Sequence, residues 1–236
     1  MELTTDDKIL YEDNHIIIVN KAVGEIVQGD KTGDRSLSED IKSYLKEKYG
    51  KQGNVYLGVV HRIDRPVSGC VLFAKTGKAA ARLSEMVKQR DFHKEYLAIT
   101  YAKPSPPNGT ITGYMVKNEK QNKSYIVNPE SNKSAVYAEL NYKYLTSSDR
   151  YHLIGIELIT GRHHQIRAQL ASIGCIIKGD VKYGAQRPNP DTSIGLHAYK
   201  IEFVHPVKKE IITVKAPFPK EEKLWKILTA DCEDKF

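Results

Sequence analysis

A carboxylate between two arginines lies in a segment suited to acid–base or nucleophilic chemistry, His61-Arg62-Ile63-Asp64-Arg65-Pro66-Val67-Ser68-Gly69. Pro66 lacks an amide hydrogen and disfavours helix at the residue before it, so we expect a loop that displays Asp64. The adjacent cations favour the ionised form of Asp64, and an ionised carboxylate that is held rigidly can act as a nucleophile or a base. From these residues alone the plainer interpretation is favoured, in which Asp64 only braces its own turn.

Two histidines and two arginines occur in a second polar segment, Thr160-Gly161-Arg162-His163-His164-Gln165-Ile166-Arg167. We expect a helix over 163–173, and cations at the start of a helix oppose its dipole unless an anion binds there. The alternative is surface charge at a frayed helix end. Neighbouring side chains on a helix diverge by about 100°, so His163 and His164 are poorly placed to share a metal ion. The sequence therefore predicts no metal site.

Tyr96 begins an apolar strand in Lys94-Glu95-Tyr96-Leu97-Ala98, and these residues alone favour a position in the core. The sequence contains no Walker-type phosphate loop, no dinucleotide-binding fingerprint, no nucleophile elbow and no metalloprotease motif, and it predicts no cofactor. Asp180 and Glu157 could be the paired carboxylates of a glycoside hydrolase. Nothing in their spacing supports that choice, and arginines rather than a second acid flank Asp64.

The composition is that of a basic globular protein of 236 residues, with a net charge of +7 and a hydrophobic fraction of 40%. A basic balance indicates a polyanionic partner such as a nucleic acid. Between His61 and Lys94, eight Lys or Arg residues accompany only three acids, which strengthens that indication. A solvated helix face would explain the same run, and charge alone favours that explanation.

The three cysteines, Cys70, Cys175 and Cys232, are far apart and lack the spacing of a disulfide framework or a zinc site. No apolar run reaches the ~20 residues needed to span a bilayer. The first residues are acidic and polar, unlike a signal peptide. We therefore expect a cytoplasmic protein without membrane contact and, because no assembly motif is evident, a monomer.

Apolar periodicity predicts hairpin-connected strands with helices interspersed irregularly. Helices are expected over 36–49, 78–90 and 163–173. We expect Ser36 and Glu39 to form a capping box at the start of the first helix, and Ile166, Leu170 and Ile173 to form the buried stripe of the last. Strands are expected over 9–11, 16–19, 55–60, 70–74, 96–101, 135–145, 151–159, 196–204 and 211–214, with short strands between 110 and 127. No repeat or linker-like shift in composition divides the chain. The prediction is a single domain over 1–236 of the α+β class, with a mixed, largely antiparallel sheet and flanking helices.

The polar segments, in this order, resemble the signatures of the RluA-type RNA pseudouridine synthases. Residues 61–69 look like the signature around that family's catalytic aspartate, 94–98 like the block with its active-site tyrosine, and 160–167 like a second signature that ends in an arginine. Further similar segments are Glu12-Asp13 with 16–21, 179–184, 196–198 and 203–206. Members of that family often carry an N-terminal S4-type RNA-binding domain, and because the resemblance begins near residue 10 we expect a catalytic domain without one.

The resemblance implies a pseudouridine synthase-like fold and the isomerisation of specific uridines in structured rRNA or tRNA to pseudouridine. This reaction involves no redox change, which agrees with the lack of cofactor motifs. Asp64 would be the catalytic carboxylate, either attacking ribose C1′ or removing a ribose proton. Arg167 would pair with Asp64, and Tyr96 would lie against the uracil.

The resemblance also implies a set of substrate-binding residues on the Asp64 loop. Arg62 would fill the space left by the flipped uridine, and His61 and Arg65 would bind the substrate beside it. The basic run from Lys75 to Lys94 would track the RNA backbone. The alternative to an enzyme is a non-catalytic RNA-binding protein on the same scaffold. The sequence identifies neither the RNA nor the uridine.

Overall fold

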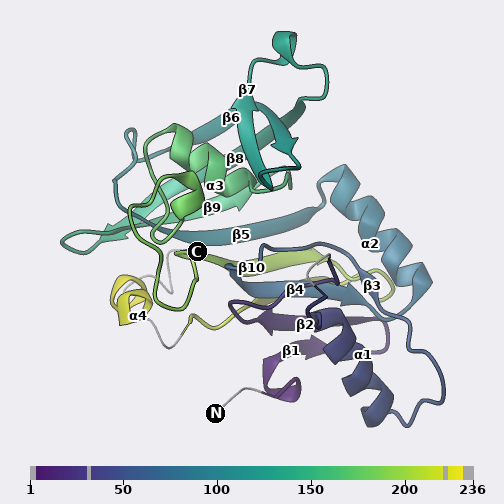
Figure 1. Cartoon of the computed structure of the whole chain (residues 1–236). Helices are drawn as coiled ribbons and strands as arrows, with labels where there is room; N and C mark the ends of the chain where they lie inside the picture. Colours follow the sequence, from purple (N-terminus) through teal and green to yellow (C-terminus); the bar gives the residue numbers. More distant parts are fainter. Residues whose placement is uncertain (1–3, 31–32, 220–222, 231–236) are drawn as a thin grey trace. The chain divides into compact units, whose positions relative to one another are not determined.

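The computed structural model of the chain describes residues 4–30, 33–219 and 223–230, and these form two compact units. The first unit combines residues up to 92 with 198–217, and the second combines 93–197 with the described residues from 218 onward. Figure 1 shows the elements of both units. Cys232 lies outside the described residues, and the single domain over 1–236 stays a prediction.

The strands of the first unit pair in antiparallel fashion around β2 and β4. β1 pairs with β2, β2 and β3 pair with β4, and β11 pairs with β10, which is also a neighbour of β4. The isoleucine run at the start of β2 is 0% exposed, as expected for a strand that is buried on both faces. These strands are β1 (Ile9–Glu12), β2 (Ile16–Lys21), β3 (Gly58–Val59), β4 (Ser68–Ala74), β10 (Leu196–Val204) and β11 (Ile211–Lys215).

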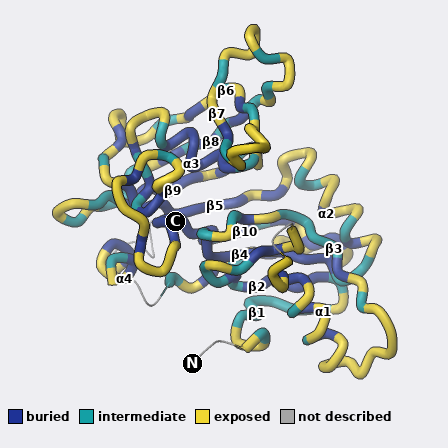
Figure 2. Tube along the Cα trace, in the orientation of Figure 1, coloured by how far each residue is buried: buried dark blue, intermediate teal, exposed yellow. Residues whose placement is uncertain are grey.

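Two amphipathic helices of this unit, α1 (Leu37–Lys48) and α2 (Gly77–Gln89), each begin at a capping side chain. Ser36 and Glu39 form the capping box expected before α1, and Thr76 caps α2. Figure 2 shows the outward sides of both helices as exposed. The apolar residues that they bury include Leu37, Ile41, Leu45, Ala79 and Leu83.

Gly69 on β4 allows two strands of the first unit to approach closely. Its φ is +117°, and a Cβ atom at this position would lie 2.2 Å from the carbonyl oxygen of Ala198 on β10. No side chain fits at that distance, so the turn after Asp64 can join β4 in this geometry only with glycine.

The second unit contains an antiparallel sheet in the order β5-β9-β8-β6-β7, with β7 at its edge. Its strands are β5 (Phe92–Thr100), β6 (Asn108–Asn118), β7 (Lys123–Val127), β8 (Val136–Ser147) and β9 (His152–Leu158). Its helices are α3 (Gln165–Ser172), the 3-10 turn η3 (Val181–Tyr183) and α4 (Lys223–Thr229). Among the described residues, no helix has both the length and the apolar character to cross a membrane.

The predicted α+β class with a largely antiparallel sheet is confirmed, as are the hairpin between 9 and 19 and the hairpin between 135 and 159. The helix predicted from residue 163 is wrong at its start, because His164 has a left-handed φ of 53° and α3 begins only at Gln165. The predicted buried position of Ile173 is also wrong, since this residue is 40% exposed. The strand predicted over 55–60 contracts to Gly58–Val59, and α4 was not predicted.

Candidate active site

Asp64 lies half-buried on the loop between β3 and β4, as the sequence predicted. Its carbonyl accepts the N–H of Val67 at 3.0 Å, which closes a tight turn. Ile63 and Val67 are 8% and 2% exposed, so apolar side chains on both sides of Asp64 fix the loop to the core. Arg62 and Arg65 on the same loop are exposed. The loop therefore displays one carboxylate and two guanidinium groups on a rigid base.

Lys21 lies fully buried beneath this loop. Its ammonium donates to the carbonyls of Ala22 and Glu25 at 2.8 Å each and to that of Arg65 at 3.2 Å. Burial lowers the pKa of Lys21 to about 7, although the carboxylates of Glu25 and Asp64 favour the charged form. The sequence analysis did not single out Lys21, although a lysine that directly ends an apolar strand is a signal for a buried charge.

His61 and Arg65 have protein partners within the first unit. The N–H of Leu72 donates to His61 Nε2 at 3.1 Å, and Arg65 pairs with the exposed Asp34 at 2.7 Å. Both contacts fix the shape of the loop that carries Asp64. A direct contact of either residue with a substrate stays a prediction.

The basic run from Lys75 to Lys94 is less uniform than the sequence analysis expected. The side chain of Lys75 is 6% exposed and pairs with Glu12 at 2.7 Å. Lys94 is 8% exposed, and Arg82 donates to the carbonyl of Pro206 at 2.8 Å. A phosphate-facing role is therefore wrong for Lys75 and Lys94, because burial withdraws both ammonium groups from the surface.

Tyr96 is 6% exposed in β5, where it stands opposite Ile156 of β9. Residues two apart on a strand project from the same face, so Lys94 and Tyr96 share one face of the sheet. The ammonium of Lys94 lies 3.5 Å from where a Cβ atom of Gly161 would be, and burial lowers the pKa of this lysine. This face of β5 therefore places a buried ammonium beside the segment that leads into α3.

Arg167 projects from α3 into a buried ion pair with Asp180. Its Nε and Nη2 atoms donate to the two carboxylate oxygens at 2.7 and 2.8 Å, and the two residues are 6% and 1% exposed. The guanidinium also lies 5.1 Å from the ring centre of Tyr183. The bidentate geometry fixes the plane of the guanidinium. The sequence analysis expected Asp64 as the partner of Arg167, a pairing that stays a prediction, and it missed Asp180 in this role.

The signal for Asp180 and Tyr183 was present in the chain. Both belong to the segment 179–184, which the sequence analysis noted as a similar block without giving its side chains a role. Gly179 in this block has a φ of +80°, and a Cβ atom at this position would lie 2.7 Å from the side chain of Asn189. The block is therefore a tight turn that presents Asp180 to α3.

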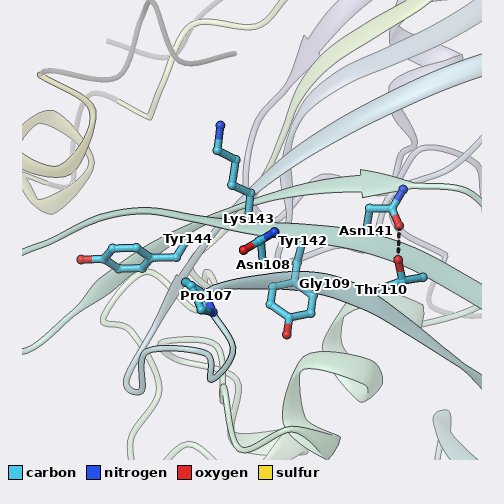
Figure 3. Close-up of a pocket in the computed structure, with 8 residues that line it drawn as sticks. All are labelled: Pro107, Asn108, Gly109, Thr110, Asn141, Tyr142, Lys143 and Tyr144. Atoms are coloured by element: carbon cyan, nitrogen blue, oxygen red, sulfur yellow. Dashed lines mark hydrogen bonds between the residues drawn. The ribbon is translucent and has the colours of Figure 1, made fainter.

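A cavity of about 530 Å³ in the second unit contains none of the predicted site residues. It lies at strands β6 and β8, and Figure 3 shows the residues that line it, with the hydrogen bond from Thr110 to Asn141. This bond has a length of 2.7 Å. Lys143 contributes an ammonium group to the lining. The other polar side chains of the lining are those of Asn108, Thr110, Asn141, Tyr142 and Tyr144. This lining lacks the carboxylate that the predicted chemistry requires.

The comparison with known proteins identifies the family to which this chain belongs. A family model described as RNA pseudouridylate synthase matches residues 15–172. The chain belongs to this family. An RNA pseudouridine synthase of Bacillus subtilis (strain 168) is 32% identical over 217 residues, or 91% of this chain and 70% of the relative. Ribosomal large subunit pseudouridine synthase C of Rickettsia prowazekii (strain Madrid E) is 33% identical over 90% of this chain and 68% of the relative.

Solved structures support the same fold. The human RNA pseudouridylate synthase domain containing 4 superimposes with a TM-score of 0.77 at 23% identity, over 92% of this chain and 90% of that chain. The human RNA pseudouridylate synthase domain containing 1 gives a TM-score of 0.72 at 21% identity, over 92% and 87%. The pseudouridine synthase fold is therefore confirmed.

The family establishes the reaction class. The protein is an RNA pseudouridine synthase, an isomerase that acts on uridine in RNA. The resemblance stated from the sequence is confirmed, and the alternative of a glycoside hydrolase is set aside. The RNA that the enzyme acts on and the residues that perform the reaction are proposals.

Proposed function

We propose that this pseudouridine synthase isomerises uridines of large-subunit ribosomal RNA and that Asp64 is its essential carboxylate. The RNA class is suggested by relatives named ribosomal large subunit pseudouridine synthase C and D, which are 33% and 30% identical. Transfer RNA is the second candidate substrate. A cytoplasmic location, a monomeric state and independence from metal ions stay predictions.

The observation that carries the proposal is the construction of the Asp64 loop. Apolar anchors at Ile63 and Val67 and the buried ammonium of Lys21 hold the loop from below, while the carboxylate remains half-buried and is not enclosed. A group that only braced a turn would not need a buried cation to hold that turn from the inside. A rigid carboxylate is what attack at ribose C1′ or removal of a ribose proton requires.

We propose that Arg167 and Tyr96 act on the same uridine as Asp64. The bidentate contact with Asp180 fixes the guanidinium of Arg167, so its remaining donors have a defined direction. Tyr96 is buried beside Lys94 on one face of β5 and would lie against the uracil ring. Each role follows the family signature at the matching position and is supported by this local order.

A uridine in a stacked helix must leave the stack before it can reach a buried tyrosine. We propose that the exposed Arg62 fills the vacated space and that His61 and Arg65 contact the flanking nucleotides. A planar guanidinium both stacks on bases and binds phosphates, which suits an exposed arginine on this loop.

The test is release of tritium from RNA labelled at uridine C5, because formation of the new C5–C1′ bond expels that hydrogen. Total RNA from cells that lack this protein is the substrate for the wild type and for Asp64→Asn. Asp40→Asn on α1 is the matched control, since it removes a partly exposed carboxylate that pairs with Arg35. We expect release by the wild type and the control and none by Asp64→Asn, which should still bind RNA.

The outcomes separate the parts of the proposal. Equal release by Asp64→Asn and wild type would remove Asp64 from the reaction. No release by any of the proteins, with RNA binding retained, would favour a binding module on the synthase scaffold. Fractionating the product RNA shows whether the pseudouridine lies in large-subunit ribosomal RNA or in transfer RNA.

A further inference from the structure

The phenol of Tyr183 joins the β6–β7 hairpin to the part of the second unit that carries Arg167. Its hydroxyl accepts the N–H of Ser124 on β7 at 2.9 Å and donates to the carbonyl of the same residue at 3.0 Å. His164 Nδ1 approaches the hydroxyl at 3.1 Å, and His163 Nδ1 lies 2.8 Å from Ser124 Oγ. Ser124 is only 3% exposed, so these bonds are sheltered from water.

The hydrogen positions at this junction follow from its contacts. The single proton of the Tyr183 hydroxyl goes to the carbonyl of Ser124, so His164 Nδ1 must carry a proton and donate to the phenol oxygen. Burial, followed by repulsion from Arg167, lowers the pKa of His164 to about 2, so this histidine is neutral. The three bonds with Ser124 and His164 are therefore compatible with one another at the Tyr183 hydroxyl.

The ring of Tyr183 contacts two cations. The guanidinium of Arg167 lies 5.1 Å from the ring centre, and the ammonium of Lys123 lies 4.9 Å from it. Both distances are within the range of cation–π attraction. The ring therefore contributes to the orientation of Arg167 in addition to the carboxylate of Asp180.

Cations gather around the hairpin at this junction. Lys182, on η3, donates to the carbonyl of Asn122 in the hairpin turn at 3.0 Å, and Lys123 lies over Tyr125 as well as Tyr183. Lys182 is exposed and Lys123 is half-buried. Two ammonium groups and an exposed tyrosine are suited to the phosphates and bases of RNA.

We propose that Tyr183 is a positioning residue through which an RNA phosphate, bound at Lys123 and Lys182, sets the orientation of Arg167. The inference rests on the proposed function, because it assumes that Arg167 acts on the uridine. It connects the binding of RNA at Lys123 and Lys182 to the orientation of Arg167, and we call this connection the relay. β7 is the edge strand and pairs only with β6 among the described residues, and the pairing of β6 with β8 ends at Met115, so the tip of the hairpin from Val116 to Ser124 can shift.

The physical argument has two steps. A phosphate at Lys123 competes with the ring of Tyr183 for the ammonium, and it draws the hairpin with it because Ser124 is the next residue. The paired bonds of Ser124 pass that shift to the phenol, and the ring passes it to the guanidinium of Arg167. The relay needs both the hydroxyl and the ring of Tyr183.

The kinetic test compares wild type, Tyr183→Phe, Lys123→Gln and the double variant on an RNA stem-loop substrate. Tyr183→Phe keeps the ring and removes the link to Ser124. Tyr114→Phe is the matched control, because Tyr114 is an exposed tyrosine on β6 of the same hairpin. We expect Tyr183→Phe to lower kcat about tenfold with KM changed less than about threefold. Lys123→Gln should raise KM and lower kcat in the wild-type background but change only KM when combined with Tyr183→Phe.

Equal effects of Lys123→Gln on kcat in both backgrounds would overturn the relay, as would wild-type kcat in Tyr183→Phe. Circular dichroism and thermal melting verify that each variant is folded. A merely structural loss at Tyr183 would lower the concentration of active protein without producing this dependence on the background.

A second readout does not require turnover. The side-chain Nε–H resonance of Arg167, identified by its loss in Arg167→Lys, is followed by NMR as the stem-loop is added. We expect this resonance to shift in the wild type and to remain in place in Tyr183→Phe at the same RNA occupancy. A shift of this resonance that is equal in both proteins refutes the relay, even if the wild type proves inactive. If the resonance shifts only in the wild type but the wild type is inactive, only the proposed function is refuted.

Discussion

Replacing Lys21 by methionine tests whether the loop that carries Asp64 depends on one buried charge. The ammonium of Lys21 donates to the carbonyls of Ala22, Glu25 and Arg65. Methionine preserves most of the length of the side chain and removes both the charge and the donors. The substitution takes a donor from three carbonyls and, in exchange, removes the cost of burying a cation.

The magnitude follows from the pKa of Lys21, which burial lowers from its ordinary value of 10.5 to about 7. A difference of that size corresponds to roughly 5 kcal/mol between the charged and neutral forms. Because the folded pKa is the lower one, the unfolded chain binds the extra proton, so the wild type becomes more stable as the pH rises from about 7 towards 10.5. Below about pH 7 this gain is absent.

Methionine does not titrate, so the stability advantage of the wild type over Lys21→Met should grow with pH. Between about pH 7 and about pH 9.5 we expect the difference in the free energy of unfolding to increase by about 3 kcal/mol. At about pH 7 the removal of the buried charge offsets only part of the cost of the lost hydrogen bonds, and the net destabilisation is roughly 1–4 kcal/mol.

Urea unfolding of both proteins across this pH range measures the difference, and tritium release measures turnover at each pH. Lys46→Met on α1 is the matched control, because Lys46 is exposed and its loss should change stability little at any pH. A difference between wild type and Lys21→Met that stays constant with pH would refute the reasoning, since Lys21 would then have an ordinary pKa. Unchanged kcat in Lys21→Met would show that Lys21 does not position Asp64.

Two further substitutions test the packing of each unit. Gly69→Ala should lower the free energy of unfolding by roughly 3 kcal/mol or more, because the new Cβ would meet a backbone oxygen at a strained φ, whereas Gly77→Ala has nothing within 4 Å and should be tolerated. Thermal melting distinguishes them, and equal melting temperatures would contradict the close approach. Asp180→Asn should cost roughly 3–5 kcal/mol in urea unfolding, because it leaves the buried Arg167 without its carboxylate. It should also lower kcat, and a variant with wild-type stability would show that the ion pair is not buried in solution.

The features that were predictable from the sequence depend on local patterns. The capping box at Ser36 is encoded within four residues, and it appears where it was expected. The position of Asp64 on a loop follows from Pro66 and from the strand that begins just after it. Alternation within β8 and β9 was enough to place their hairpin. Each of these depends on residues that are close in the chain.

The features that were missed depend on contacts between distant residues. Lys21 is separated by 44 positions from Arg65, whose carbonyl it binds, and no local pattern connects them. Asp180 lies 13 positions beyond Arg167, across a turn that only the fold closes. The late start of α3 has a similar origin, since the left-handed His164 is held by its bond to Tyr183. Helix propensity alone would have continued the helix backwards.

The side chains that hold the loop of Asp64 and the guanidinium of Arg167 are buried ions, namely Lys21 and Asp180. Replacing a buried ion pair by apolar side chains of similar volume is often neutral or stabilising, so stability does not explain the pair of Arg167 with Asp180. Apolar packing fills space but does not fix the direction of a group, whereas charged hydrogen bonds at 2.7–2.8 Å do. A protein that needed only a stable helix could use apolar side chains in place of Arg167 and Asp180. The use of buried charge instead is best explained by a need to hold Asp64 and Arg167 in fixed orientations, which the proposed reaction requires of the side chains that perform it.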